Sequence, residues 1–260
     1  MARAALYGRI VLGASAVLFG IIALMWHDVD TWQGLARIWK LPGGRVIGDC
    51  LMVAQIAGGA GLIFPRTARV ASIVFGAVYA LFALDRIGGI IVQPGNFLQY
   101  DSFAEAFSLV CAALAIYAAT DTNAAQAAML GRTARIGLGL CTIAFTLAQV
   151  FFLKATADLV PAWIPPNQTF WAVLTTVAFA LAAIAMLVNR QAQLAMRLMT
   201  LMLVLFGLLV WVPIVITHPQ SHNDWSEFSI NFLIAGAAWV IAESQPVPEP
   251  SLEVSTARTS

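Results

Sequence analysis

The chain of 260 residues is too apolar for a water-soluble protein, because 60% of its residues are hydrophobic and only 10% are charged. Soluble domains carry about 25% charged residues, so most of the surface of this protein must face lipid. The net charge of +1 and the lack of basic runs in the sequence exclude a nucleic-acid-binding surface.

Eight apolar stretches are long enough to cross a bilayer as helices, which takes about 20 residues for a hydrocarbon core of about 30 Å. Membrane strands are excluded because stretches such as 184–188 do not alternate between apolar and polar residues. The first stretch is longer than the apolar part of a signal peptide and is predicted to be retained. In chain order, the predicted spans are 6–25, 46–64, 68–92, 102–119, 135–153, 169–188, 194–217 and 227–243.

The positive residues predict the orientation, because short loops rich in Lys and Arg stay in the cytoplasm. Nine arginines lie at the ends that hold the N-terminus, three tight turns and the C-terminal tail, and five Lys or Arg residues lie at the other ends. We therefore predict a multi-pass protein of a bacterial-type cytoplasmic (inner) membrane with both termini inside. Trp163, Trp171 and Trp225 are expected at the outer lipid headgroups, where amphipathic rings prefer to lie.

A weak internal repeat recurs at an offset of 124–126 residues, since residues 9–13 (RIVLG) resemble residues 135–139 (RIGLG) and Pro94 matches Pro219. The predicted fold is an all-α membrane protein with eight transmembrane helices in two four-helix bundles. The bundles are parallel repeats, because each has an even number of spans. The predicted organisation is a first repeat at 1–119, a cytoplasmic linker at 120–134, a second repeat at 135–243 and a disordered cytoplasmic tail at 244–260.

The second repeat carries a distinctive set of motifs: Val160-Pro161-Ala162-Trp163-Ile164-Pro165, Phe170-Trp171, Asp224-Trp225-Ser226-Glu227, Asn231-Phe232 and Ala235-Gly236-Ala237. These motifs resemble the DoxX family of small four-helix bacterial membrane proteins. The first repeat looks like a diverged copy that lacks the Pro-rich loop. The resemblance implies a membrane subunit of an oxidoreductase system, the namesake being associated with thiosulfate oxidation and quinone reduction, and it implies no fixed set of catalytic residues.

Charged residues within or beside the spans are the main candidates for a functional site, because charges at such depths are rare and face the protein interior or a partner. The predicted polar cluster lies at the outer end of the first repeat and consists of Asp49, Asp85, Arg86 and Glu105. We expect Asp49 to hold Arg86. The alternative is a simple anchor, since an arginine side chain reaches the headgroups easily.

Polar residues at the outer ends of the other spans are secondary candidates. His218 and His222 are four residues apart, which on a helix would suit two metal ligands, but Pro219 between them disfavours a regular helix. A histidine just outside the first span invites a haem or proton-relay role, although an interfacial polar residue is the ordinary case. No metal or haem signature follows, and quinone stays possible as a cofactor. The secondary candidates are His27, Asp28, His218, His222, Asp224 and Glu227.

Motifs of autonomous enzymes are missing from the sequence, including phosphate-binding Gly-rich loops, serine elbows and paired C-x-x-C cysteines. The favoured hypothesis is an accessory or quinone-interacting subunit of a membrane oxidoreductase system. Its expected partners are the lipid bilayer and a redox partner protein. The alternatives are a small-solute or lipid-related transporter with a site at the repeat interface, and a structural membrane partner without chemistry.

Overall fold

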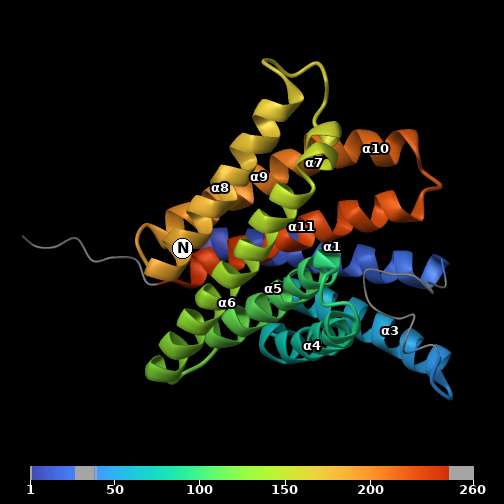
Figure 1. Ribbon diagram of the computed structural model, residues 1–260. Helices are drawn as coiled ribbons and strands as arrows, with labels where there is room; N and C mark the ends of the chain where they lie inside the picture. The colour runs from blue at the N-terminus through green and yellow to red at the C-terminus, as the bar shows by residue number, and fades with distance from the viewer. Residues whose placement is uncertain (1, 27–37, 39, 246–260) are drawn as a thin grey trace, which may run out of the picture.

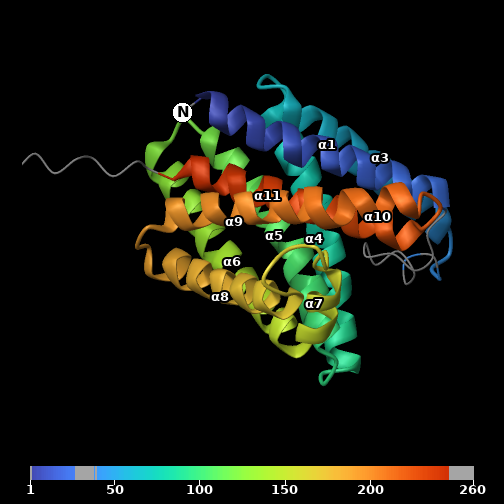
Figure 2. The same cartoon turned by 90° about the horizontal axis from the view of Figure 1, so that it is seen from above.

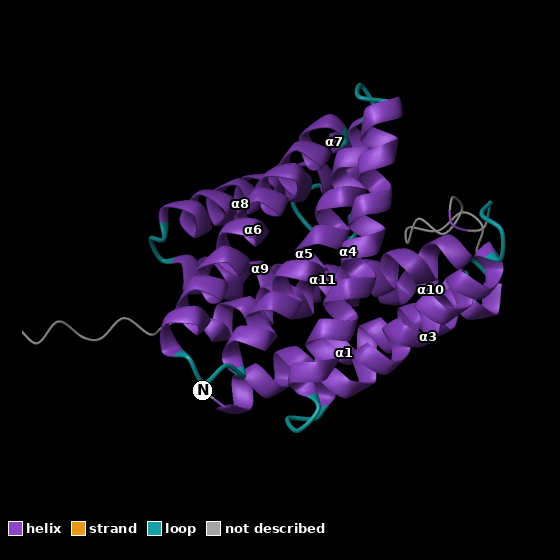
Figure 3. Ribbon diagram, turned by 90° about the horizontal axis from the view of Figure 1, so that it is seen from below, coloured by secondary structure: helices purple, strands orange, loops and turns teal. Residues whose placement is uncertain are grey.

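The computed structural model describes residues 2–26, 38 and 40–245, and this part of the chain holds helices and turns without a strand (Figure 3). Eight of its helices or helix runs are long and apolar enough to cross a membrane, as predicted. They are α1 (Ala2–Trp26), α3 (Gly44–Ile63), α4 (Ala68–Val92), α5 (Phe97–Ala119), α6 (Ala124–Phe151), α8 (Gln168–Val188), the run of α9 (Ala192–Phe206), η1 (Gly207–Trp211) and α10 (Val212–Thr217), and α11 (His222–Ser244). A short helix, α7 (Leu153–Leu159), precedes α8.

Capping side chains start three helices earlier than the apolar pattern predicts. Asn96 and Ser221 cap α5 and α11, so these helices take in polar residues that the predicted spans leave out. The Asn123 side chain accepts from two backbone N–H groups and starts α6 at Ala124. Most of the segment predicted as a linker, 120–134, is therefore helical, because its Ala-rich sequence forms a helix readily once it is capped.

Each spanning helix packs against the next one in the chain, and α11 packs against α1 to close the ring (Figures 1 and 2). Helices α5 and α11 also contact each other across the ring, and they are the most buried of the spans. The order of neighbours is the same in the α1–α5 half as in the α6–α11 half. Superposition of the two halves as repeats stays a prediction.

Both ends of the described chain lie at the same end of the bundle (Figures 1 and 2), as an even number of spans requires. We call this the inner end, which also holds the turns at 64–67, 120–123 and 189–191. The outer end holds the loops at 93–96, 160–167 and 218–221. The names follow the predicted orientation, which stays a prediction. The predicted tail begins at the end of α11, and its residues 246–260 lie outside the described part of the chain.

The outward faces of the helices are apolar and contact the lipid bilayer. Four side chains on these faces are more than half exposed: Leu84 on α4, Leu181 and Ile184 on α8, and Leu198 on α9. Exposure of such side chains to water would be unfavourable, whereas contact with lipid tails has no such cost. Glycines set the closest helix approaches inside the ring. A Cβ atom on Gly236 of α11 would lie 2.6 Å from the backbone nitrogen of Leu12 on α1.

Candidate functional site

Four charged side chains meet at the outer end, between the two halves of the molecule. Asp101 and Glu105 lie one turn apart on α5, Glu227 comes from α11 and Arg86 comes from α4. The Glu105 carboxyl interacts electrostatically with the other three side chains. All four are half-buried. We call this group the interface cluster.

Two of the four predicted residues, Arg86 and Glu105, belong to the interface cluster, and Asp85 precedes Arg86 on α4 as a half-buried residue. Asp49 lies apart from the cluster. It is exposed, and within the described part of the chain no ion pair joins it to Arg86. The reason is helical geometry, because Gly48 and Met52 face the interior from α3 and Asp49 lies off that buried face.

Among the secondary candidates, Glu227 belongs to the interface cluster and interacts electrostatically with Asp224. His218 Nδ1 lies 3.5 Å from Asp224 Oδ2, so this histidine extends the polar region toward the outer loop. His222 Nε2 lies 3.2 Å from the hydroxyl of Ser226 on the same helix. His27 and Asp28 lie outside the described residues.

The two histidines do not share a helix, since α10 ends at Thr217 and α11 begins at His222, as the proline between them suggested. Among the described residues, no group of three or more His, Cys, Asp or Glu side chains is arranged to hold a metal ion. The interface cluster consists of three carboxyl groups and one guanidinium. Carboxyl groups of this kind can exchange protons or bind a cationic group.

Asp101 is a member of the cluster that was not among the predicted site residues. One of its carboxylate oxygens, Oδ1, is buried and accepts no hydrogen bond from the described residues. The sequence contains a usable signal, because Asp101 and Glu105 have the i, i+4 spacing that places two side chains on one helix face. Asp101 was not predicted as a site residue because the fourth span was predicted to begin at residue 102, which places Asp101 outside the helix.

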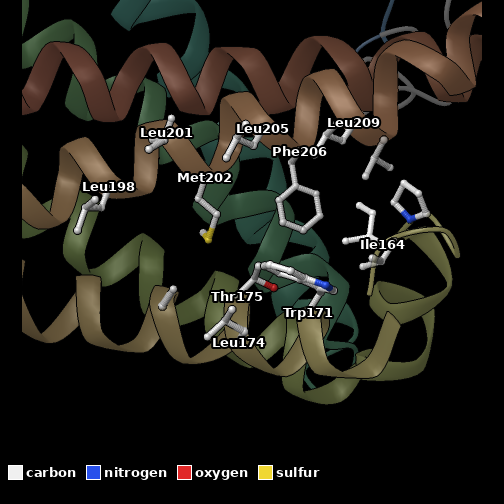
Figure 4. A pocket seen from close by; sticks show the side chains of 14 residues that line it. Ile164, Trp171, Leu174, Thr175, Leu198, Leu201, Met202, Leu205, Phe206 and Leu209 are labelled. Atoms are coloured by element: carbon white, nitrogen blue, oxygen red, sulfur yellow. The ribbon is translucent and has the colours of Figure 1, made fainter. Parts of the chain in front are cut away.

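A second candidate site is an apolar groove between α8 and the run of α9 and η1, with a volume of about 360 Å³ (Figure 4). This volume lies within the range of about 300–1,000 Å³ typical of small-molecule sites. We call it the outer groove. Its lining consists of Val160, Pro161, Ile164, Trp171, Leu174, Thr175, Ala178, Leu198, Leu201, Met202, Leu205, Phe206, Leu209 and Val210.

The loop at 160–167 lines the outer end of this groove with Val160, Pro161 and Ile164. The Trp171 indole donates a hydrogen bond to the Pro165 carbonyl at 2.9 Å, and the Gln168 amide donates to the Val160 carbonyl. Both bonds tie the loop to the first turns of α8. The Trp171 ring is thereby held in place at the mouth of the groove, with Phe206 and Thr175 close to it (Figure 4).

Thr175 is the hydroxyl-bearing residue of the lining, and it belongs to a small polar network within the membrane-spanning region. The side-chain amide oxygen Oε1 of Gln149 on α6 accepts from Thr176 at 2.9 Å and from Thr175 at 3.4 Å. The Thr175 hydroxyl also lies 3.0 Å from the Ala172 carbonyl, and this shorter bond is the stronger of its two contacts. A ligand in the groove that accepts from Thr175 therefore competes with the Ala172 carbonyl for the same proton.

On the wall formed by α9, the helix widens into the π-helical segment η1, in which the Val212 N–H donates to the Gly207 carbonyl. Single π-helical turns inside α-helices occur frequently at functional sites. Leu209 and Val210 of this segment line the outer groove. The segment was not predicted from the sequence.

No family model matches this chain, and comparison with the curated proteins and with the solved structures found no match.

Proposed function

We propose that this integral membrane protein is an accessory, quinone-interacting subunit of a membrane oxidoreductase system, and that the quinone binds in the outer groove. The observation that carries the proposal is the composition of the groove. It combines an aromatic mouth, formed by Trp171 and Phe206, with one hydroxyl and otherwise apolar walls. A quinone has the matching parts: a flat conjugated ring, carbonyl oxygens that accept hydrogen bonds, and an apolar tail.

The resemblance to the DoxX family adds support, because the residues that carry it coincide with the groove. Val160, Pro161, Ile164 and Trp171 belong to the DoxX-like motifs and line the outer groove. Membership of this family is a hypothesis. If it holds, the DoxX-like motif at residues 160–171 would form part of a ligand-binding site.

In the proposed complex, Trp171, Phe206 and Thr175 contact the quinone ring. The rings of Trp171 and Phe206 pack against the quinone ring, as aromatic groups do at offset or edge-to-face geometries. The Thr175 hydroxyl turns from the Ala172 carbonyl and the Gln149 side chain and donates to a quinone carbonyl. The groove opens between two lipid-facing helices, so a quinone enters it sideways from the bilayer. Electrons are supplied by the partner oxidoreductase, and this chain binds and positions the quinone.

Purification in a mild detergent, followed by solvent extraction and identification of bound quinone, tests the proposal. We expect the wild-type protein to retain a stoichiometric amount of quinone and Trp171→Ala to lose it. Trp225→Ala is the matched control, because Trp225 on α11 donates the same type of hydrogen bond to the Pro219 carbonyl in the preceding loop and does not line the groove. A wild-type protein that neither retains nor rebinds quinone, or equal loss in both variants, would refute the proposal.

One observation favours a transporter as the second candidate function. The interface cluster lies where the two halves meet, at the contact of α5 with α11, and transporters built from repeats place their substrate and ion sites at the repeat interface. Proton-driven uptake into proteoliposomes, abolished in Glu105→Gln, would support this function. Uptake that does not differ from empty liposomes would exclude it for the solutes tested.

A further inference from the structure

A second cavity continues the outer groove toward the inner end of the bundle. Its volume is about 350 Å³, close to the 360 Å³ of the outer groove. Ala178, Leu198 and Met202 line both cavities, so the two meet midway along the seam between α8 and α9. Figure 4 shows Leu198 and Met202 on the α9 side of this junction.

Together the two cavities follow α8 from Trp171 to Ala185. At 1.5 Å per residue this is a path of about 21 Å, or about two thirds of a hydrocarbon core of about 30 Å. A compact solute would leave most of such a path empty. A long, thin, apolar chain lying parallel to the helices fits its shape.

The two ends of the path differ in chemistry. The outer end has the aromatic mouth and Thr175. The inner cavity is lined by apolar side chains as far as Gln191, with Ala185 on α8 and Ala195 on α9 leaving room between the helices. A molecule in this path would therefore place its polar, planar end outward and its apolar end inward.

We propose that the inner cavity holds the isoprenoid tail of the quinone and makes the site selective for long-tailed quinones. This inference rests on the proposed function, since it takes the quinone ring to lie in the outer groove. Ala185 and Ala195 are the positions at which the tail site can be tested, because a phenylalanine side chain at either position would occupy space in the cavity that the tail needs.

The selectivity comes from packing contacts. A tail in the bilayer is already in apolar surroundings, so its transfer into the groove brings no hydrophobic gain. What the cavity offers is close contact with fixed side chains, and dispersion contacts of this kind accumulate along a chain. Filling the inner cavity should therefore abolish the advantage of a long tail and leave the binding of the ring unchanged.

Equilibrium binding in detergent micelles tests the inference with two radiolabelled quinones that share one head group, the first with a single isoprene unit and the second with a full-length tail. We expect the wild-type protein to bind the long-tailed quinone more tightly. Ala185→Phe and Ala195→Phe should weaken long-tail binding about fivefold or more, as overpacking does, and leave short-tail binding unchanged. Ile184→Phe is the control, because Ile184 is exposed to lipid beside Ala185 and lines neither cavity.

The outcomes separate this inference from the proposed function. Equal affinity of the wild-type protein for both quinones overturns the tail site and leaves the quinone site standing, and this comparison needs no variant to fold. Equal weakening of both quinones by Ala185→Phe also overturns it. If neither quinone binds and lipid extraction recovers only phospholipid, both the proposed function and the tail site are wrong.

Discussion

At the scale of single residues, the outer end is organised by three Pro–aromatic clamps. In each, a proline is followed two residues later by a helix-capping side chain and four residues after that by an aromatic residue, which donates a hydrogen bond back to the proline carbonyl. The clamps are Pro94-Asn96-Tyr100 at the start of α5, Pro165-Asn167-Trp171 at the start of α8 and Pro219-Ser221-Trp225 at the start of α11. The first and third are separated by 125 residues, in line with the predicted repeat.

Removal of the donor from a clamp should loosen the loop it holds. Tyr100→Phe and Trp225→Phe should each lower the free energy of unfolding by about 0.5–1.5 kcal/mol, the net value of one hydrogen bond. Thermal unfolding in detergent measures the effect. Trp163→Phe serves as control, since Trp163 is 73% exposed and donates no hydrogen bond to a described residue. Equal losses in the control and the clamp variants would contradict the structural role of the clamps.

The interface cluster predicts an energetic coupling between Arg86 and Glu105. Arg86→Met should destabilise the protein, because it leaves three carboxylates without their cation at membrane depth. Glu105→Gln should recover part of the loss in the double variant, with a coupling of about 0.5–3 kcal/mol. Asp49→Asn is the control, because Asp49 is exposed away from the cluster. Strictly additive effects of Arg86→Met and Glu105→Gln, measured by denaturation in detergent, would show that the two groups do not interact.

At the scale of helices, the contact between α1 and α11 depends on Gly236. A Cβ atom there would meet backbone and side-chain atoms of Leu12 at 2.6–2.9 Å, and a backbone cannot yield as a flexible side chain can. Gly236→Ala should therefore cost about 1–3 kcal/mol, the usual effect of overpacking. Gly131→Ala on α6 is the matched control, because the nearest atom to its added Cβ lies 4.0 Å away.

The control should be neutral or slightly stabilising, since alanine is favoured over glycine in a helix by roughly 0.5–1 kcal/mol. Thermal stability of the two variants relative to the wild-type protein gives the comparison. A Gly236→Ala variant as stable as Gly131→Ala would mean that α1 and α11 do not approach each other this closely.

The helices were largely predictable from the sequence, and the reasons for the exceptions are physical. The third and sixth spans match their predicted ranges closely because turns containing proline or polar residues bound both of them. Helices α5 and α11 were predicted too short, since polar residues such as Asp101 and His222 are tolerated in their first turns. The π-helical segment depends on tertiary contact: Gly207 lies against Phe232 and Asn231 of α11, and the Asn231 amide donates to the Leu203 carbonyl.

At the scale of the whole molecule, the interface cluster could be predicted only in part. Arg86 and Glu105 were identifiable as charges inside spans. The contact of α5 with α11 brings Glu227 to them, and this pairing of helices far apart in the chain has no signature in composition or periodicity. The groove could not be predicted for the same reason, because a cavity between α8 and α9 depends on how these two largely apolar helices pack.

The arrangement of the termini gives a prediction for the intact protein. Both ends of the described chain lie at the inner end, and the positive residues predict that this end faces the cytoplasm. A reporter that is active only in the periplasm, fused after Gln245, should give no signal, whereas the same reporter inserted in the loop at 218–221 should give a strong one. Activity at the C-terminus together with silence in that loop would invert the orientation.

The central claim is that a quinone binds between α8 and α9, and photo-crosslinking tests it most directly. A quinone with a photoreactive group on its ring is illuminated with the purified protein, and the modified peptides are identified by mass spectrometry. We predict that the label attaches to residues 160–175 and to residues 201–210, with competition by unlabelled quinone. Specific labelling confined to α5 and α11, or labelling that unlabelled quinone does not reduce, would contradict the account.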